Sequence, residues 1–401
     1  MLREITTCEV CGNKNLDEVM NLGSHPMCDD LIEIGSSKVC KEYPIEILFC
    51  NDCITAHQRF QIPKHDLFPK TYHYRAKHTK DVLNGMQSLV NSCEKYNLNA
   101  KKILDIGCND GSLLSFFAEK KAITFGIEPT DAYIDASNAG HHVINAFFCE
   151  ETAEDVAKTH GLFDIITFTN VFAHIEDLNE VIRGLKKIMH ENSIIVIENH
   201  YLGAVLEKFQ FDTFYHEHPR TYSFTSFMHI AKLLDRSIAH VEFPSRYNGN
   251  IRIFYGPKIK SSDSTQWETL IAQEKNFGND LLKMSKELSS WIKQTKAHIT
   301  TQIDQYGKLT AKAFPGRAAI PIKLLGLNEN HIDAVYEKPH SAKVGYYVPG
   351  TRIPILSDTQ FDAINYKAPL LNFAWHIGNE IRNYMHDLGY KGQIIDIIST
   401  S

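Results

Sequence analysis

Residues 102–113 read Lys-Ile-Leu-Asp-Ile-Gly-Cys-Asn-Asp-Gly-Ser-Leu, and this stretch decides the fold. The apolar residues around Asp105 predict a buried strand, and a helix is expected to begin after Gly111. Gly107 and Gly111 allow the backbone between them to pass close to a ligand. The turn lacks the further glycines that make room for a pyrophosphate in the GxGxxG fingerprint, so it favours a ligand without phosphates.

The region from residue 77 onward alternates apolar runs with amphipathic segments. A helix is predicted over 77–97, and most segments between the apolar runs have helical periodicity, which is the pattern of a doubly wound α/β sheet. Ligands of such sheets bind at the carboxyl ends of the strands. The predicted strands are 102–107, 123–128, 142–148, 163–170, 193–199, 238–243 and 251–255.

A second acidic residue, Glu128, ends the next predicted strand in Gly126-Ile-Glu-Pro129. A carboxylate at that place can accept hydrogen bonds from both hydroxyls of a ribose. Together with the turn after Asp105, it predicts a site for S-adenosylmethionine. The alternative is that both carboxylates only cap helices or lie in solvent. The combination resembles the motif set of class I methyltransferases.

That resemblance implies which residues bind the methyl donor. Gly107 and its neighbours would lie under the methionine portion, Glu128 would hold the ribose, and the loop 146–148 would cover the adenine. The strand end at 170–172 would face the transferable methyl group. The expected donor site comprises Asp105, Gly107, Asn109, Asp110, Gly111, Glu128, Phe147, Phe148 and Asn170.

Cysteines are concentrated at the N-terminus, where six of the nine lie in the first 53 residues. An odd total argues against a disulfide framework. Cys8-Glu-Val-Cys11 and Cys50-Asn-Asp-Cys53 are two CxxC pairs, and four thiolates form a closed tetrahedral site typical of structural zinc. The alternatives are an iron centre or unrelated reduced cysteines. Cys28 and Cys40 are expected to be small buried residues.

The charge balance of the chain indicates which classes of partner are not expected. The 401 residues carry 42 Lys and Arg against 48 Asp and Glu, and the first 70 residues hold no basic cluster interleaved with aromatic residues. A nucleic acid is therefore not expected as a partner. No apolar run approaches the roughly 18 residues needed to span a bilayer. Residues 1–10 do not have the composition of a secretory signal, so we expect a cytoplasmic protein without a membrane partner.

Two segments at predicted strand ends hold many titratable residues: 170–175, and Phe-Asp-Thr-Phe-Tyr-His-Glu-His at 211–218. A lone histidine such as His174 is more often a core or surface residue than a catalytic one. The second segment is denser in such residues than solvated faces usually are, and histidine is poised to exchange a proton near neutral pH. Together with the donor motif and the CxxC pairs, these segments resemble the sugar C-methyltransferases of deoxysugar biosynthesis.

The resemblance runs from the CxxC pairs to about residue 256 and continues more weakly to the C-terminus. Those enzymes methylate C3 of a nucleotide-linked 4-keto-6-deoxy sugar. The resemblance therefore implies S-adenosylmethionine and structural zinc as cofactors, and a nucleotide-diphosphate sugar as the small-molecule partner. By resemblance, His218 is the base, and His174 hydrogen bonds near the keto oxygen.

The resemblance also implies further residues on the acceptor side. Tyr215 and Glu217 would position the base or the sugar, and Tyr72 or Tyr74 would enter the site. Where the family usually has His-Gly-Gly-Ser-Leu-Arg, this chain has Tyr-Asn-Gly-Asn-Ile-Arg at 247–252, which removes a histidine and changes the acceptor cleft. The expected substrate-binding residues of this segment are Asn248, Asn250 and Arg252.

Residues 262–306 have helical periodicity and predict one long helix or two. A final α/β unit follows, with strands expected at 309–314, 332–336, 353–356 and 363–366, a helix over 370–388 and a last strand near 394. This order resembles the family's second Rossmann-like domain, which helps to enclose the nucleotide diphosphate. Arg317, Lys343 and Arg352 could hold its phosphates; the alternative is that they are ordinary surface charges.

The sequence therefore predicts an α/β protein whose class I methyltransferase, Rossmann-like domain is joined to an N-terminal zinc-binding domain and a C-terminal Rossmann-like domain. The expected boundaries are 1–70, 71–260, a helical linker at 261–306, and 307–401. The leading hypothesis is a C-methyltransferase that acts alpha to the ketone of a nucleotide-linked 4-keto deoxysugar through an enolate. The alternatives are O- or N-methylation of another small polar or phosphorylated metabolite, and a zinc-ribbon binding protein without catalysis.

Overall fold

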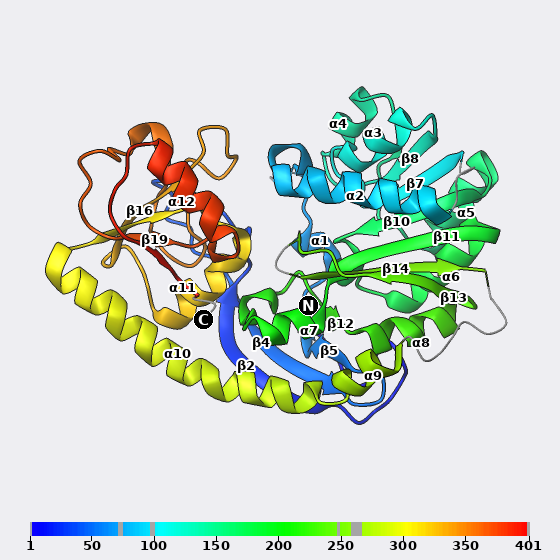
Figure 1. Cartoon of the computed structure of the whole chain (residues 1–401), viewed down its shortest axis with the longest axis horizontal. Coiled ribbons are helices and arrows are strands. Elements are labelled where there is room, and N and C mark those ends of the chain that lie inside the picture. The colour runs from blue at the N-terminus through cyan, green and yellow to red at the C-terminus, as the bar shows by residue number, and fades with distance from the viewer. Residues whose placement is uncertain (1, 71–74, 97–100, 247–248, 258–266, 399–401) are drawn as a thin grey trace. The chain divides into compact units, whose positions relative to one another are not determined.

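The computed structural model describes residues 2–70, 75–96, 101–246, 249–257 and 267–398 (Figure 1). Its contacts divide the chain into two compact units. The first unit is Met1–Asp17, Leu48–Glu207 and Glu217–Gly278, and the second is Glu18–Ile47, Lys208–His216 and Asn279–Ser401. This division differs from the boundaries expected above, because residues 18–47 of the cysteine-rich segment belong to the unit that contains the C-terminus.

A seven-stranded sheet organises the first unit, in the order β13-β14-β11-β10-β7-β8-β9. Among the described residues its strand pairings are parallel except those of β14, which is antiparallel to both β11 and β13. Parallel strands end at one edge, which places the turns after β7, β8, β10 and β11 together. The strands are β7 (Lys102–Ile106), β8 (Ile123–Ile127), β9 (His142–Ile144), β10 (Phe163–Thr169), β11 (Met189–His200), β13 (Ser237–Glu242) and β14 (Asn250–Gly256).

Helices cover both faces of this sheet, as strand alternation requires. Neighbouring residues Ile165 and Ile166 of β10 point to opposite faces, so Ile165 packs with Leu89 of α2 while Ile166 packs with Leu185 of α6. The two faces carry separate hydrophobic clusters. The helices of the unit are α1 (Lys64–Leu67), α2 (Lys80–Tyr96), α3 (Ser112–Glu119), α4 (Tyr133–Asn138), α5 (Glu150–His160), α6 (Leu178–Ile188), α7 (Leu202–Glu207), α8 (Phe224–Leu234) and α9 (Glu268–Glu274).

Short strands surround the cysteine pairs of the first unit. β1 (Arg3–Glu4) pairs with β6 (Phe60–Gln61), and β5 (Thr55–Gln58) pairs with β12 (Arg220–Tyr222), both antiparallel. The boundaries between the two units fall after the first residue of β2 (Asp17–Pro26) and within β4 (Glu42–Cys50).

The second unit contains a five-stranded parallel sheet in the order β18-β16-β15-β19-β20. The strands are β15 (Leu309–Lys312), β16 (Ile332–Glu337), β18 (Ile355–Ser357), β19 (Leu370–Asn372) and β20 (Ile394–Asp396). Its helices are α10 (Phe277–Tyr306, drawn in yellow in Figure 1), whose first two residues belong to the first unit, α11 (Ala319–Leu325) and α12 (Gly378–Asp387). β3 (Ile32–Glu33) pairs with β17 (Tyr346–Tyr347) in the same unit.

The structure corrects two predicted elements of the second unit. The strand expected at 363–366 is a turn, and residues 370–372, expected to begin a helix, form β19. The run Leu370-Leu-Asn-Phe-Ala374 is too short and too apolar for periodicity to separate a buried strand from a helix. Residues 370–372 form a strand because they pair with β15 on one side and β20 on the other. The helix begins only at Gly378.

Among the helices that the structure describes, none is long and apolar enough to cross a membrane.

Candidate functional site

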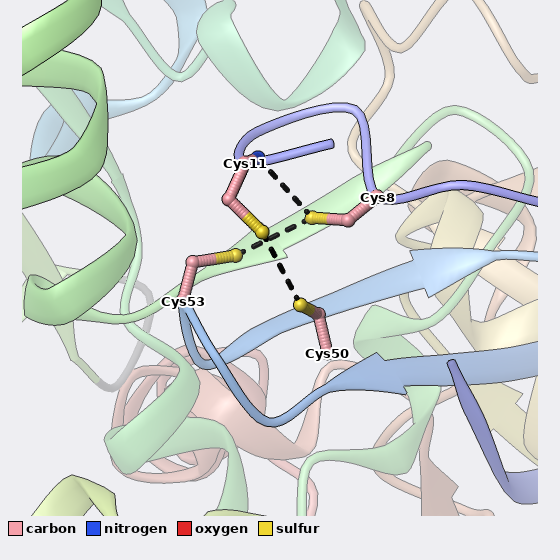
Figure 2. Close-up of side chains that lie close together, drawn as sticks. All are labelled: Cys8, Cys11, Cys50 and Cys53. Atoms are coloured by element: carbon pink, nitrogen blue, oxygen red, sulfur yellow. Dashed lines mark hydrogen bonds between the residues drawn. The ribbon is translucent and has the colours of Figure 1, made fainter. Parts of the chain in front are cut away.

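The four paired cysteines of the first unit converge on one centre (Figure 2). Their sulfur atoms all lie within 4.8 Å of one another; Cys8 Sγ is 3.3 Å from Cys53 Sγ, and Cys11 Sγ is 3.5 Å from Cys50 Sγ. A tetrahedral zinc ion with Zn–S bonds of about 2.3 Å needs sulfurs about 3.8 Å apart, so these residues fit the metal closely. The site brings together the four residues that the sequence predicted as ligands.

Two buried polar side chains beside the cysteines were not anticipated from the sequence. His57 Nε2 lies 3.3 Å from Cys8 Sγ, and Thr55 Oγ1 lies 3.1 Å from Cys53 Sγ. Donors at these places stabilise thiolates and orient metal ligands. Both residues lie in β5, only two and four residues after Cys53, so proximity to the second CxxC pair was the available signal.

The turn after β7 has the backbone shape that a bound ligand requires. Gly107 has φ +72, and a Cβ atom on it would lie 2.6 Å from Val171 Cγ2, so only glycine fits there. Gly111 has φ +78 and precedes α3, while Asn109 also has a positive φ. Asp110 accepts hydrogen bonds from Ser112 Oγ at 2.6 Å and from the Lys77 amide at 2.8 Å, which fixes the turn.

Asp105 and Glu128 lie at the ends of β7 and β8, as expected, but their surroundings differ. Asp105 is buried and accepts a hydrogen bond from Thr167 Oγ1 at 2.6 Å. Burial, opposed by this bond and assisted by the charge of Glu128, raises the pKa of Asp105 to about 7. Asp105 is therefore an internal support of the turn, and its direct contact with a donor stays a prediction.

Glu128 is held in one orientation by three donors. Its Oε1 accepts from the Thr130 amide at 2.9 Å and from Thr130 Oγ1 at 2.6 Å, and its Oε2 accepts from the Asn109 amide at 2.9 Å. A carboxylate offers about four lone-pair sites, so one site on Oε2 remains for a ligand hydroxyl. The sequence-based expectation of two ribose hydroxyls on Glu128 stays a prediction.

Polar atoms at the end of β10 are buried without a hydrogen-bond partner among the residues that the structure describes. Thr169 Oγ1 and Asn170 Nδ2 are both in this state, and Asn170 has φ +54. Buried polar atoms are nearly always hydrogen bonded in folded proteins, so such atoms at the carboxyl edge of the sheet indicate a ligand position. These atoms and the Gly107 turn fit the expected S-adenosylmethionine.

The two phenylalanines expected to cover the adenine have different surroundings. Phe147 packs edge-on against His65 at 4.9 Å between ring centroids, beside Lys64. Phe148 packs against the hydrophobic core, 6.2 Å from the ring of Phe168, and a Cβ atom on Gly184 would meet it at 3.1 Å. Phe147 is therefore the better placed of the two to contact a ligand.

The acceptor side contains a row of three histidines in the first unit. The ring centroids of His174 and His218 are 4.9 Å apart, and those of His218 and His200 are 5.3 Å apart. His174 Nδ1 donates to the Glu217 carbonyl at 2.6 Å, and burial lowers the pKa of His174, so the neutral ring presents a lone pair on Nε2. A neutral ring with this tautomer accepts a hydrogen bond at Nε2, which suits a substrate hydroxyl better than a keto oxygen.

His200 was missed by the sequence interpretation. It ends β11, one residue beyond the strand predicted over 193–199, and strand ends at this edge of the sheet are ligand positions. Extending the predicted strand by one residue would have identified it. Tyr72, Tyr74 and Asn248, which the sequence placed in the site, lie outside the described residues.

Two predicted substrate-binding residues of the first unit are engaged in internal contacts. Asn250 Nδ2 donates to Glu198 Oε1 at 2.9 Å and to Asn170 Oδ1 at 3.1 Å. The buried Arg252 donates to Glu198 Oε2 at 2.7 Å and to Glu242 Oε2 at 2.6 Å, so two carboxylates compensate its charge. Binding of substrate by these residues stays a prediction.

The remaining predicted residues belong to the second unit, where the three cations also have internal partners. Arg317 Nε lies 3.0 Å from Asp212 Oδ2, Lys343 Nζ lies 3.3 Å from Asp29 Oδ1, and Arg352 donates to two backbone carbonyls, Ser36 O and Lys38 O. These contacts favour structural roles over free surface charges, and phosphate binding stays a prediction. Tyr215 is half-buried in this unit.

The zinc assignment predicts a specific loss on replacing one ligand. Cys50→Ser should abolish stoichiometric zinc binding and lower the free energy of unfolding by about 3 kcal/mol or more, because the metal helps to fold this segment. Zinc content and denaturant unfolding measure both. Cys149→Ser is the control, since Cys149 caps α5 by accepting from the Thr152 amide and serine can do the same. Full zinc content in Cys50→Ser would contradict the assignment.

The donor site predicts that Glu128→Gln weakens S-adenosylmethionine binding about 10-fold, because a charge-assisted hydrogen bond of about 1.5–3 kcal/mol is replaced by a neutral one. Titration calorimetry measures the dissociation constant. Glu119→Gln is the control, since Glu119 is an exposed residue at the end of α3. Equal affinities of the wild type and Glu128→Gln would show that the carboxylate does not bind the donor.

Comparison with known proteins agrees with this geometry. Three family models match in order: "Putative zinc binding domain" at residues 8–68, "Methyltransferase domain" at 76–238 and "C-methyltransferase C-terminal domain" at 246–398. The C-methyltransferase NovU of Streptomyces niveus is 26% identical over 393 residues, which cover 95% of this chain and 92% of NovU.

Other similarities cover only part of the chain. A ubiquinone biosynthesis O-methyltransferase of Glaesserella parasuis is 34% identical over 107 residues, which are 25% of this chain and 45% of that protein. A SAM dependent methyltransferase structure from Archaeoglobus fulgidus has a TM-score of 0.37 at 15% identity, and covers 43% of this chain and 94% of that one.

The matched domains coincide with the features described above. The four cysteines lie in the first match, and the glycine turn, Glu128 and the histidines lie in the second. The match with NovU extends over nearly the whole of both chains. The chain therefore belongs to the S-adenosylmethionine-dependent C-methyltransferases that combine a zinc-binding domain, a methyltransferase domain and a C-methyltransferase C-terminal domain, and it is a homologue of NovU.

Proposed function

We propose that the acceptor is a nucleotide-linked 4-keto-6-deoxy sugar, and that the enzyme methylates the carbon alpha to its ketone. The observation that carries the proposal is the close pair formed by the half-buried His174 and the buried His218, with ring centroids 4.9 Å apart in the unit that holds the donor turn. Carbon methylation needs a base, whereas the donor turn alone would serve any methyltransferase.

The reaction requires a carbon nucleophile. His218 takes the proton from the carbon next to the ketone, and the electron pair of the broken C–H bond moves onto the carbonyl oxygen as an enolate. Bound S-adenosylmethionine supplies an electrophilic methyl group on its sulfonium. The enolate carbon would then bond to that methyl carbon while the methyl–sulfur bond breaks and its electron pair stays on sulfur, which leaves as S-adenosylhomocysteine. The ketone is restored, and the proton stays on His218. A base within hydrogen-bond reach typically contributes about 10²–10⁴-fold to such a step.

The surrounding residues support this chemistry by orientation and by exclusion of water. The hydrogen bond from His174 Nδ1 to the Glu217 carbonyl fixes the ring of His174 and links it to the backbone next to His218. Glu217 and His218 are buried, so a proton on the base is not shared with bulk water. In the neutral His174 ring with its proton on Nδ1, Nε2 carries the lone pair that would accept a hydrogen bond from a sugar hydroxyl.

The proposal is tested with a panel of 4-keto sugars carried on thymidine, guanosine and cytidine diphosphates. A product heavier by one methylene is expected, with the new methyl group on carbon by carbon NMR. The proton alpha to the ketone should exchange with deuterium in heavy water. Methylation of an oxygen or nitrogen without this exchange would instead support the O- or N-methyltransferase alternative.

Replacing the base should separate chemistry from binding. His218→Gln should reduce methyl transfer and alpha-proton exchange by about 10²–10⁴-fold, because the side chain no longer accepts a proton. Donor affinity should stay within about twofold, since donor and base lie on different turns. His190→Gln is the control, because His190 pairs with Asp164 at the start of β11. Substantial residual exchange in His218→Gln would transfer the role of base to His174.

The neutral state of His174 predicts a pH-dependent stability. Burial lowers the folded pKa of His174 below its ordinary value of 6.5, so around pH 6 the unfolded chain binds a proton that the folded protein does not. The neutral ring contributes stability that is present above pH 6.5 and lost as the pH falls through the folded pKa, at up to about 1.4 kcal/mol per pH unit. Other histidines with lowered pKa values contribute equally to both proteins, so denaturant unfolding should show a smaller slope in His174→Gln than in the wild type. Equal slopes would show that the buried ring is not neutral.

A further inference from the structure

Arg220 lies two residues after His218 and is fully buried. Its Nε donates to Tyr222 Oη at 2.9 Å, and its Nη1 donates to Glu9 Oε2. The same guanidinium donates to the backbone that follows His174, through Nη2 to Ile175 O and through Nη1 to Glu176 O. One side chain thus reaches a carboxylate, a phenol and two carbonyls.

The two carbonyl contacts act together with the His174 bond. His174 donates from its ring to the backbone of Glu217, while Arg220 donates from its side chain to the backbone of Ile175. The segments 174–176 and 217–220 are therefore cross-linked in both directions. The two links thus join the segments that carry His174 and His218, which lie 44 positions apart in the chain.

Arg220 also connects this pair of segments to the metal site. Its partner Glu9 directly follows Cys8, and Gln61 Nε2 donates to the same Glu9 oxygen at 2.9 Å. In the pairing of β5 with β12, Arg220 lies opposite His57, whose Nε2 is 3.3 Å from Cys8 Sγ. The route from the zinc ligands to the histidines thus consists of adjacent, buried contacts.

We propose that Arg220 is a positioning residue for the transfer reaction: it holds His174 and His218 at their working separation and connects that geometry to the zinc-binding cysteines through Glu9. A buried arginine is poor evidence of added stability, because its desolvation offsets the energy of its ion pair. Its planar, forked donors instead suit the simultaneous binding of separate acceptors. The inference rests on the proposed function, in which His218 is the base.

The test is Arg220→Lys, which retains the positive charge and removes the forked geometry. The maximal rate of transfer should fall about 10- to 100-fold, as expected for a displacement of about 1 Å, while the KM for S-adenosylmethionine stays within twofold. The ring ¹⁵N signals of His174 and His218, assigned from His→Gln variants, should shift in the zinc-loaded protein without substrate. This second measurement needs no acceptor, so it tests the positioning even if the proposed sugar is wrong.

Arg236→Lys is the matched control. Arg236 also donates to two backbone carbonyls, those of His190 and Glu191, at 2.6 and 2.7 Å, at the other end of β11. The Arg236→Lys substitution should leave both the rate of methyl transfer and the ¹⁵N signals of His174 and His218 unchanged. An unchanged rate together with unchanged signals in a folded Arg220→Lys protein would overturn the proposal.

Glu9→Gln covers the case in which Arg220→Lys does not fold. It keeps a side-chain oxygen beside Arg220 and removes the charge that anchors the guanidinium. The histidine signals should shift in the same direction as in Arg220→Lys, with a smaller decrease in rate and with zinc still bound, as measured by metal content. Unshifted signals in a zinc-loaded Glu9→Gln protein would show that Glu9 does not transmit the position of the cysteines, and would overturn that link.

Discussion

Parallel pairing of β7, β8, β10 and β11 is the constraint on which the donor site depends. Because these strands run in one direction, the turns that follow them meet at one edge of the sheet, although the strand ends at Ile106 and His200 are 94 residues apart in the chain. The glycine turn, the carboxylate of Glu128 and the polar end of β10 are thereby collected without any local sequence signal that relates them. The two hydrophobic clusters on the sheet faces keep the strands in this register.

Buried charges in the first unit are compensated in pairs and triads. Arg252 bridges Glu198 and Glu242, and Arg220 binds Glu9 together with two carbonyls. Such groups add little net stability, because desolvation offsets their attraction, but they require a particular arrangement of the segments that they join. The arrangement matters most beside His174 and His218, where a transfer reaction depends on the separation of side chains.

Several parts of the site could be predicted because their signal is local. Each CxxC pair and the turn from Asp105 to Gly111 carry their geometry within a few residues, and the four cysteines do converge on one centre. Arg252 and Arg317 were different: the sequence shows a cation at each position, but not the carboxylate opposite it, which comes from another strand or helix. The strand β19 was mistaken for a helix because a short apolar run has no period of its own.

The sequence by itself determined the class of chemistry. Three features of short segments indicate that chemistry. The spacing of the cysteines indicates a zinc site, the glycine turn with its acidic partner indicates a methyl donor, and the density of histidines near residue 218 indicates a base. Only the tertiary structure decided which residues act together. His200 lies beside His218. Arg220 binds the segments that contain His174 and Cys8. Arg252 is buried in an ion pair with Glu198. These contacts join residues that are distant in the chain, and their distances follow from strand register and packing, which no short stretch of sequence specifies.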